Sequence, residues 1–352
     1  MQQSRPNFFR MPRGSLLRSN LNSIFGNLAV EEALLVRPMP NPVLFLWRNN
    51  ATVTVGRHQN PWKECNLKLM EDSGVTLARR YSGGGAVFQD LGCTTFTLAC
   101  EIDASTSIPR LIDRNFEMIG GALEKLGIRA YRKGRNDLMV GDSKVSGSAY
   151  KQTSNRFVHH GTILVNTDMS SLGRFLTPSK LKLQSKGISS VVSRVSNLSE
   201  VVPSVDHEKV CDALTKEFCK TYQCNGEFPE FVDEIIQIDP VFIRHHAQLR
   251  DWHWRFGSTP QFSHTVETRI EGIGMFECHY DVEREKITKV KIFSDILLAE
   301  LVDKLENALR DCEYNPSAVG ASLNNEVCSI RSSEQEKQIF ASFTEWIIYE
   351  MF

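Results

Sequence analysis

A run of three glycines preceded by two arginines is the first stretch of this sequence that could bind a charged group. From residue 79 to residue 88 the chain reads RRYSGGGAVF, so the glycines lead directly into an apolar, strand-like segment. Glycine loses more conformational freedom on folding than other residues do, so three in a row require a local reason. Such backbone lets its N–H groups approach an anion, and neighbouring guanidinium groups suit phosphate or carboxylate. The stretch therefore predicts an anion-binding loop, with a hairpin turn and solvated arginines as the alternative.

Lys144 is the second candidate, because it begins a predicted strand of unusually small residues. Gly141-Asp142 predicts a tight turn before it, and residues 146–149 are Ser, Gly, Ser and Ala. Small side chains would leave space beside the strand for an extended ligand. From this segment alone, an ordinary edge strand with a solvated lysine is the favoured interpretation.

The histidines and cysteines give weaker indications of a binding or catalytic site. His159 and His160 are adjacent in a predicted strand at residues 157–165, so they point to opposite faces and cannot easily bind one metal ion. The nine cysteines are scattered and include no Cys-x-x-Cys pair, which argues against a zinc site or a redox motif. We expect reduced thiols.

A mixture of strands and helices must position these side chains. Further β-rich runs occur at residues 43–47, 52–55, 75–80 and 94–99, and apolar residues at helical spacing occur at 27–35 and 111–126. Residues 170–199 are rich in Ser and Lys with little periodicity, which is typical of a lid or of disorder. After residue 245 the pattern predicts three strands and then helices, the last one beginning with a Ser333-x-x-Glu336 capping box.

Length and composition limit the possible classes of protein. A chain of 352 residues suits one large domain and a smaller one, and we expect a division into residues 1–20, 21–245 and 246–352. A net charge of −1 argues against a nucleic-acid-binding protein, and no apolar run reaches the roughly 18 residues that span a membrane. Residues 1–20 are basic and contain no acid, which favours a mitochondrial targeting segment over a basic tail without a role. Without such targeting, the cytoplasm is the expected location.

Taken together, these stretches resemble the lipoate–protein ligase A family. The matching segments are residues 44–49, 56–66, 77–88, 134–138, 144–150, 159–162, 185–188, 194–198 and 252–257. The resemblance spans residues 24–352. It implies an α+β fold, with a large biotin/lipoyl ligase-like catalytic domain of mixed β-sheets and flanking helices and a small C-terminal α+β accessory domain.

The resemblance also implies an activity in two steps. Lipoate and ATP with Mg²⁺ give lipoyl-AMP and pyrophosphate, and a lysine of a lipoyl domain then takes the lipoyl group. Lys144 is implied as the catalytic residue, stabilising charge on the carbonyl oxygen, and Asp137 suits Mg²⁺ through oxygen ligation. The residues implied to contact ATP or lipoyl-AMP are Arg80, Ser82, Gly83, Gly84, Gly85, Ala86, Val87, Phe88, Asn136, Asp137, Lys144, His159 and Gly161.

The implied partners follow from family and compartment. They are the lipoyl domains of 2-oxoacid dehydrogenase E2 subunits and the glycine-cleavage H protein, and the chain itself is expected to be a monomer.

The chain departs from the family just after the glycines. Family members usually carry His-Asp-x-Gly-Asn there, whereas residues 89–93 read QDLGC. Gln89 cannot transfer a proton, and Cys93 replaces an amide by a weakly polar thiol. Three alternatives stay open: a lipoyltransferase that uses only preformed lipoyl-AMP, an octanoyltransferase with Cys93 as its nucleophile, and a lipoate- or adenylate-binding protein without catalysis.

Overall fold

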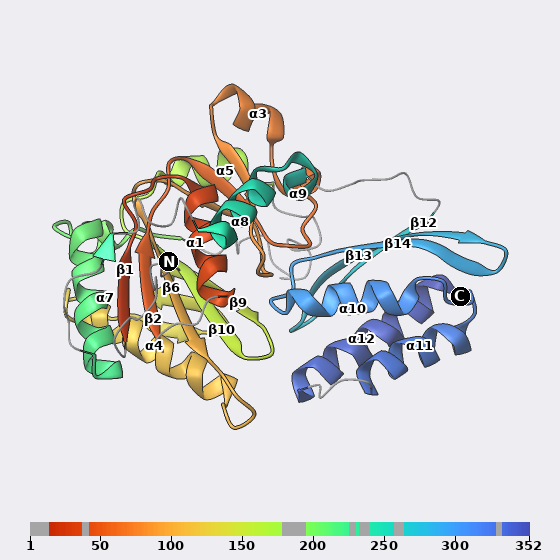
Figure 1. Ribbon diagram of the computed structural model, residues 1–352. Coiled ribbons are helices and arrows are strands. Elements are labelled where there is room, and N and C mark those ends of the chain that lie inside the picture. The colour runs from red at the N-terminus through yellow and green to blue at the C-terminus, as the bar shows by residue number, and fades with distance from the viewer. Residues whose placement is uncertain are drawn as a thin grey trace, which may run out of the picture.

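The computed structural model describes residues 14–36, 42–177, 195–224, 230–231, 239–256, 264–328 and 333–352. Figure 1 shows a larger part, which contains the N-terminal and central elements, beside a smaller part built from the C-terminal elements. The α+β class and this arrangement of a large part with mixed sheets and flanking helices beside a small C-terminal part confirm the predicted fold.

An eight-stranded mixed sheet forms the centre of the larger part, in the order β11-β1-β2-β6-β10-β9-β8-β7. Its strands are β1 (Ser15–Arg18), β2 (Val43–Trp47), β6 (Cys93–Glu101), β7 (Tyr131–Lys133), β8 (Asp137–Val140), β9 (Ser143–Gln152), β10 (Arg156–Leu164) and β11 (Glu230–Phe231). Strands β6, β10 and β9 pair antiparallel, whereas β1 and β2 pair parallel.

Helices cover both faces of this sheet (Figure 1). Helices α4 (Ile108–Glu124) and α7 (His207–Tyr222) pack on one face, and α1 (Ile24–Val36) and α8 (Pro240–Arg250) pack on the other. Successive side chains of a strand point to opposite faces, so Phe157 and Val158 of β10 enter different cores. The same alternation separates the two histidines that follow.

A second, three-stranded sheet carries the triglycine segment. It consists of β3 (Thr52–Val55), β4 (Thr76–Arg79) and β5 (Val87–Gln89) in the order β4-β3-β5, and the glycines connect β4 to β5. Short helices pack around it: α2 (Pro61–Glu64), α3 (Leu67–Asp72), α5 (Met169–Phe175) and α9 (Trp252–Phe256), and the 3₁₀ turn η1 (Leu198–Glu200) lies near the end of β10.

The smaller part is an antiparallel sheet covered by three helices. Its strands are β12 (His264–Ile270), β13 (Gly274–Glu283) and β14 (Lys286–Ser294), and its helices are α10 (Ala299–Leu309), α11 (Pro316–Cys328) and α12 (Glu334–Met351). These elements share one apolar core, and Figure 1 shows the helices on one side of the strands. Helix α12 begins with the predicted capping box, in which the Ser333 hydroxyl accepts from the Glu336 N–H.

The expected divisions of the chain can now be compared with the elements. Residue 245 lies inside α8, which packs along α1, and α9 packs on β4, so residues 246–256 lie with the larger part. At the other end, β1 begins at Ser15, within the segment expected to be a separate basic tail. Residues 1–13, and the middle of the expected lid at 178–194, lie outside the described residues.

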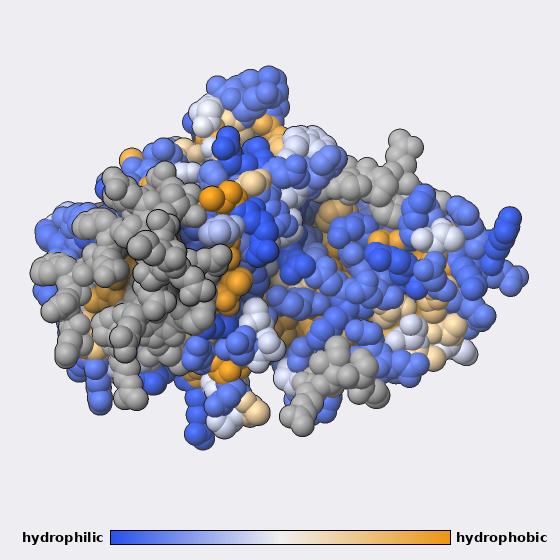
Figure 2. All heavy atoms as spheres, viewed as in Figure 1, coloured by the Kyte–Doolittle hydropathy of each residue, from blue (hydrophilic) through white to orange (hydrophobic). Residues whose placement is uncertain are grey.

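The face of the protein seen in Figure 2 is largely polar. On the face seen in Figure 2 the coloured residues are mostly hydrophilic, and apolar residues occur there in small groups. Among the residues that the structure describes, no helix is long and apolar enough to cross a bilayer.

Candidate ligand-binding site

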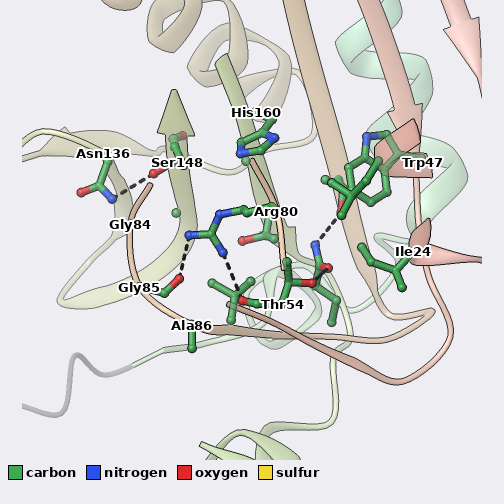
Figure 3. A pocket seen from close by; sticks show the side chains of 18 of the residues that line it. Ile24, Trp47, Thr54, Arg80, Gly84, Gly85, Ala86, Asn136, Ser148 and His160 are labelled. Atoms are coloured by element: carbon green, nitrogen blue, oxygen red, sulfur yellow. Dashed lines mark hydrogen bonds between the residues drawn. The ribbon is translucent and has the colours of Figure 1, made fainter. Parts of the chain in front are cut away.

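A pocket lies between the loop that carries the three glycines (residues 82–86, the glycine loop), strands β9 and β10, and helix α1. In Figure 3, Asn136 and Ser148 lie at one end, and Ile24 and Trp47 lie at the other. The pocket therefore has a polar end and an end with apolar walls. The other lining residues are Leu28, Thr54, Arg80, Gly84, Gly85, Ala86, Val87, Gln89, Thr95, Lys144, Gly147, Ala149, His160, Gly161 and Thr162.

The polar end is built by the β8–β9 hairpin. Lys144 extends its amine to Asp137 Oδ1 (2.6 Å), and a β-carbon added to Gly147 would lie 2.8 Å from that amine. The small residue is thus needed to make room for the lysine. Asn136 and Ser148 join the strands beside it through hydrogen bonds of 2.8 and 3.0 Å. The small residues therefore form the predicted space, and Lys144 lines it as a partly exposed cation.

Arg80 shapes the glycine loop from inside the protein. Its guanidinium donates to the carbonyl oxygens of Thr54 (3.1 Å), Gly83 (2.7 Å) and Gly85 (2.8 Å), and its Nε donates to Ser82 Oγ (3.1 Å). Burial lowers the pKa of Arg80 to about 10. Because these hydrogen bonds occupy the guanidinium, Arg80 supports the glycine loop and does not present free N–H groups to a phosphate.

Arg79 is used in a similar way on the other side of β4. Its guanidinium donates at 2.7–3.1 Å to the carbonyl oxygens of Gly56, Arg57, Gln59, Trp254 and Arg255. Neither arginine is solvated, so the alternative of a hairpin with exposed arginines is wrong. Both cations hold backbone together around the glycine loop.

The smaller part of the protein touches the glycine loop directly. The Gly84 N–H donates to the Ile296 carbonyl oxygen (3.0 Å), in the connection between β14 and α10. A β-carbon at Gly83 would lie 2.0 Å from that same oxygen, so glycine is required for this approach. The Ser294 N–H also donates to the His58 carbonyl oxygen (2.8 Å). The contact is therefore made by the backbones of both parts.

Charged side chains flank this backbone contact. Arg57 lies 2.7 Å from Asp303 of α10, and Lys63 lies 2.9 Å from Glu277 of β13. The opposite charges face each other across the junction of the two parts.

The two adjacent histidines have different surroundings, as their positions in a strand require. His159 is fully buried beside the rings of Phe96, Phe116 and Tyr150, and burial lowers its pKa to about 3. His160 lines the pocket. The sequence argument selected His159, whereas the structure brings its neighbour to the site.

His160 joins a carboxylate to the glycine loop. Its Nδ1 lies 2.8 Å from both carboxylate oxygens of Glu31, and its Nε2 lies 2.7 Å from Ser82 Oγ. Burial alone would raise the pKa of Glu31, but His160 and the Thr97 hydroxyl hold it below its usual value. The carboxylate is therefore ionised at neutral pH.

The two departures from the family pattern have different environments. Gln89 lines the pocket, and its amide is held by Asn49 (3.3 Å), Thr54 (3.1 Å) and Thr95 (3.2 Å). Cys93 is buried, and burial raises its pKa to about 12. Because only a thiolate is an effective nucleophile, this environment argues against Cys93 as a catalytic cysteine.

Most of the predicted site residues come together in the pocket. Those that line it are Arg80, Gly84, Gly85, Ala86, Val87, Asn136, Lys144 and Gly161. Those outside the lining are Ser82, Gly83, Phe88, Asp137 and His159. Phe88 instead stacks on Phe175 in a separate core (5.8 Å), because it alternates with Val87 and Gln89 on β5.

Sequence reasoning missed the apolar end. Ile24 and Leu28 of α1 and Trp47 of β2 line the pocket there. Thr95, Thr162 and His160 also line the pocket and were not predicted. In sequence, the first three belong to apolar segments that look like ordinary core. Period-two alternation puts His160 and Thr162 on one face of β10 and His159 on the opposite face, but it does not say which face meets the pocket.

Comparisons with known proteins place this geometry in context. A model of the lipoyl protein ligase A/B catalytic domain matches residues 23–219, and a model of the bacterial lipoate protein ligase C-terminus matches residues 259–346. A lipoate-protein ligase A of Psychrobacter cryohalolentis is 42% identical over 342 residues, which cover 96% of this chain and 98% of that protein.

Solved structures agree in fold. The P. falciparum protein LipL1 in complex with lipoate is 33% identical, covers 96% of this chain and 99% of its own, and superposes with a TM-score of 0.83. A lipoate-protein ligase A bound with ATP is 25% identical (TM-score 0.58; 70% of this chain, 99% of that chain). A bipartite lipoate protein ligase of Thermoplasma acidophilum, studied with its E2 lipoyl domain, is 25% identical (TM-score 0.59; 72% and 100%).

Proposed function

The chain belongs to the lipoate–protein ligase A family, and from this premise we propose that its pocket holds the lipoyl adenylate between the glycine loop and Lys144. The protein is an ATP-dependent lipoate–protein ligase. It activates lipoate with ATP to lipoyl-AMP and pyrophosphate, and it then transfers the lipoyl group to a lysine of a lipoyl domain. The observation that carries the proposal is that Lys144 and the glycine loop line one pocket.

The two ends of the pocket suit the two ends of the acyl group. The walls at Ile24, Leu28 and Trp47 offer an apolar environment for a hydrocarbon chain and its ring. The end with Lys144 and Asn136 offers a cation and an amide for the carboxyl group. An extended amphipathic acid would therefore bind with its carboxyl group beside Lys144.

Lys144 acts on charge in both steps of the reaction. In the first, the carboxylate of lipoate attacks the α-phosphorus of ATP, a C–O–P bond forms and pyrophosphate leaves. In the second, the amine of the acceptor lysine attacks the acyl carbon, AMP leaves and the amine loses a proton. A cation at the acyl–phosphate junction stabilises the negative charge that develops on these oxygens. No covalent bond to the enzyme is needed.

Asp137 is the residue that we propose to hold Mg²⁺. In the described part of the chain, no group of three or more Asp, Glu, His or Cys side chains could hold a metal ion alone. Mg²⁺ commonly binds one or two carboxylates and completes its coordination with water and substrate phosphates, which fits a single carboxylate here. The ion would neutralise phosphate charge during activation, while Asp137 also orients the Lys144 amine at 2.6 Å.

We also propose a location and partners. The basic residues Arg5, Arg10, Arg13 and Arg18 support mitochondrial targeting, with the cytoplasm as the alternative. In a mitochondrion the acceptors would be lipoyl domains of 2-oxoacid dehydrogenase E2 subunits and the glycine-cleavage H protein, modified by a monomeric enzyme. Residues 1–20 fused to a fluorescent protein should direct it to mitochondria, and diffuse fluorescence would contradict this.

An activation assay tests the proposed function. The purified protein with lipoate and ATP, but without acceptor, should release pyrophosphate and form lipoyl-AMP. Lys144→Ala should lower that rate by about 10²–10³-fold, as expected for loss of one electrostatic donor. Lys133→Ala, at an exposed lysine of β7, serves as the control. A protein that transfers preformed lipoyl-AMP but releases no pyrophosphate is a lipoyltransferase, and a fully active Lys144→Ala would exclude our site.

A further inference from the structure

Arg80 carries a buried positive charge that has no carboxylate beside it. Its guanidinium is fully enclosed and contacts only carbonyl oxygens and the Ser82 hydroxyl. Among the residues that the structure describes, no carboxylate lies within ion-pair distance of this arginine. Burial lowers the pKa of Arg80, and the charge of Glu31, which lies beyond ion-pair distance, opposes this effect.

The chain of contacts from Arg80 leads to this charge. Arg80 Nε lies 3.1 Å from Ser82 Oγ, Ser82 Oγ lies 2.7 Å from His160 Nε2, and His160 Nδ1 lies 2.8 Å from Glu31. Figure 3 shows Arg80 and His160 as neighbours in the middle of the pocket. We call these four residues the Glu31–Arg80 relay. It connects helix α1, strand β10 and the glycine loop.

The charged groups at the two ends fix the direction of the hydrogen bonds that they make. Glu31 can only accept, so His160 Nδ1 carries the proton and donates it. The other ring nitrogen, Nε2, makes the hydrogen bond with Ser82 Oγ (2.7 Å). Arg80 can only donate, so Ser82 Oγ accepts from Arg80 Nε. A neutral amide at position 31 can donate as well as accept, so it would no longer fix the orientation of the His160 ring.

On this basis we propose that Glu31 is a positioning residue for lipoate activation, acting through His160 and Ser82 on Arg80 and thereby on the glycine loop. The inference rests on the proposed function of the pocket and adds a residue that fixes the geometry of the glycine loop. Arg80 ties the carbonyl oxygens of Gly83 and Gly85 inward. Loosening that arginine would let these residues turn, and their backbone would no longer present the same surface to the ligand.

A serine, a histidine and a carboxylate in line also occur in hydrolases, where the serine is the nucleophile. Here Ser82 is only 2% exposed and lies outside the pocket lining, while His160 forms part of the wall. An acyl group in the pocket therefore meets the histidine and not the hydroxyl. The arrangement fits positioning and does not fit an acyl-enzyme.

The test combines steady-state kinetics of pyrophosphate release with a double-mutant cycle. Glu31→Gln and Ser82→Ala should each raise the KM for lipoate about tenfold, with a smaller change in kcat. Because both residues act through one relay, the KM for lipoate of the double variant should stay within about twofold of that of the single variant with the higher KM. Glu31→Asp keeps the charge and should recover most of the affinity lost in Glu31→Gln.

Glu32→Gln is the matched control, because Glu32 is the next residue of α1, is equally buried and pairs instead with Lys151 (2.6 Å). It should leave the KM for lipoate within about twofold of the wild-type value, whatever it does to stability. Additive effects in the double variant, or a normal KM for Glu31→Gln, would overturn the relay. If the proposed function itself fails, the wild-type protein releases no pyrophosphate, which is a different outcome.

A spectroscopic measurement covers variants that fold too poorly for kinetics. A histidine N–H that donates to a buried carboxylate gives a slowly exchanging, far-downfield proton resonance. The wild-type protein should show this signal, and His160→Asn should remove it. Its presence in His160→Asn at full intensity would contradict the donor that we assign to His160.

Discussion

Gly83→Ala should separate the smaller part of the protein from the glycine loop. The added β-carbon would lie 2.0 Å from the Ile296 carbonyl oxygen and 2.9 Å from that of Leu297. Carbon and oxygen without a bond between them require more than 3 Å, so one of the two backbones must move by about 1 Å. No flexible side chain can absorb the displacement, because both obstacles are main-chain atoms.

The energy of this change can be worked out from the contacts that are lost. The hydrogen bond from Gly84 N–H to Ile296 (3.0 Å) would break, and a buried polar group left unsatisfied costs about 1–3 kcal/mol. Alanine also lowers the conformational entropy of the unfolded chain, which raises the free energy of unfolding by about 0.4–1 kcal/mol. We therefore expect Gly83→Ala to lower the free energy of unfolding by about 1 kcal/mol.

Gly85→Ala provides the contrast two residues away. A β-carbon there meets no atom within 4 Å, and its backbone does not lie in the left-handed region. Stability should stay the same or rise slightly. Gly85 lines the pocket, however, so the methyl group takes up ligand space and the KM for lipoate should rise. One substitution should thus affect stability and the other ligand binding.

Urea unfolding, together with hydrogen–deuterium exchange at the Gly84 amide, measures the first effect, and pyrophosphate release measures the second. In Gly83→Ala the Gly84 amide should exchange much faster than in the wild-type protein. Wild-type stability and wild-type protection of this amide in Gly83→Ala would refute the reasoning. Equal destabilisation by the two substitutions would refute it as well.

Three further expectations can be checked with simple measurements. Cys93→Ala should retain full lipoyl transfer, because burial raises the pKa of that thiol to about 12 and leaves almost no thiolate; loss of transfer with a normal fold would revive a cysteine mechanism. Arg57→Asp should lower the free energy of unfolding measured in urea by up to about 1 kcal/mol, and adding Asp303→Arg should restore it, because the reversed charges can pair again across the 2.7 Å contact; no recovery in the double variant would contradict this. His159→Phe should make the free energy of unfolding fall less steeply as the pH is lowered. Burial lowers the pKa of His159 to about 3 from an ordinary 6.5, so protonation of this histidine destabilises the folded state progressively as pH falls from about 6.5 towards 3. A variant whose stability falls as steeply as that of the wild type would contradict this.

The sequence predicts the chemistry of the glycine loop better than the function of its arginines. The three glycines indicated an anion-binding loop, and the family resemblance implied that Lys144 acts on the same ligand; the structure has both line one pocket. Arg79 and Arg80, however, bind backbone carbonyl oxygens from segments 20 to 176 residues away in sequence, as well as from the loop itself. Such partners are set by tertiary packing, which a local pattern does not contain.

The apolar end of the pocket was hidden for a related reason. Trp47 belongs to a strand in which all five residues are buried, so its wall position has no signature of its own. The assignment of His159 in place of His160 shows the same limit, since alternation separates the two faces without saying which one meets the ligand. The final capping box needed no such knowledge, because Ser333 and Glu336 are partners within one turn.

The first strand bears on the mitochondrial targeting that we propose. Strand β1, Ser15–Arg18, lies inside the large sheet with β2 on one side and β11 on the other. If the proposed targeting segment is removed after import, a cut beyond about Gly14 would remove the strand that separates β2 from the edge strand β11. A mature form beginning near residue 20, where the basic composition ends, would leave β2 with an unpaired edge and would be prone to self-association.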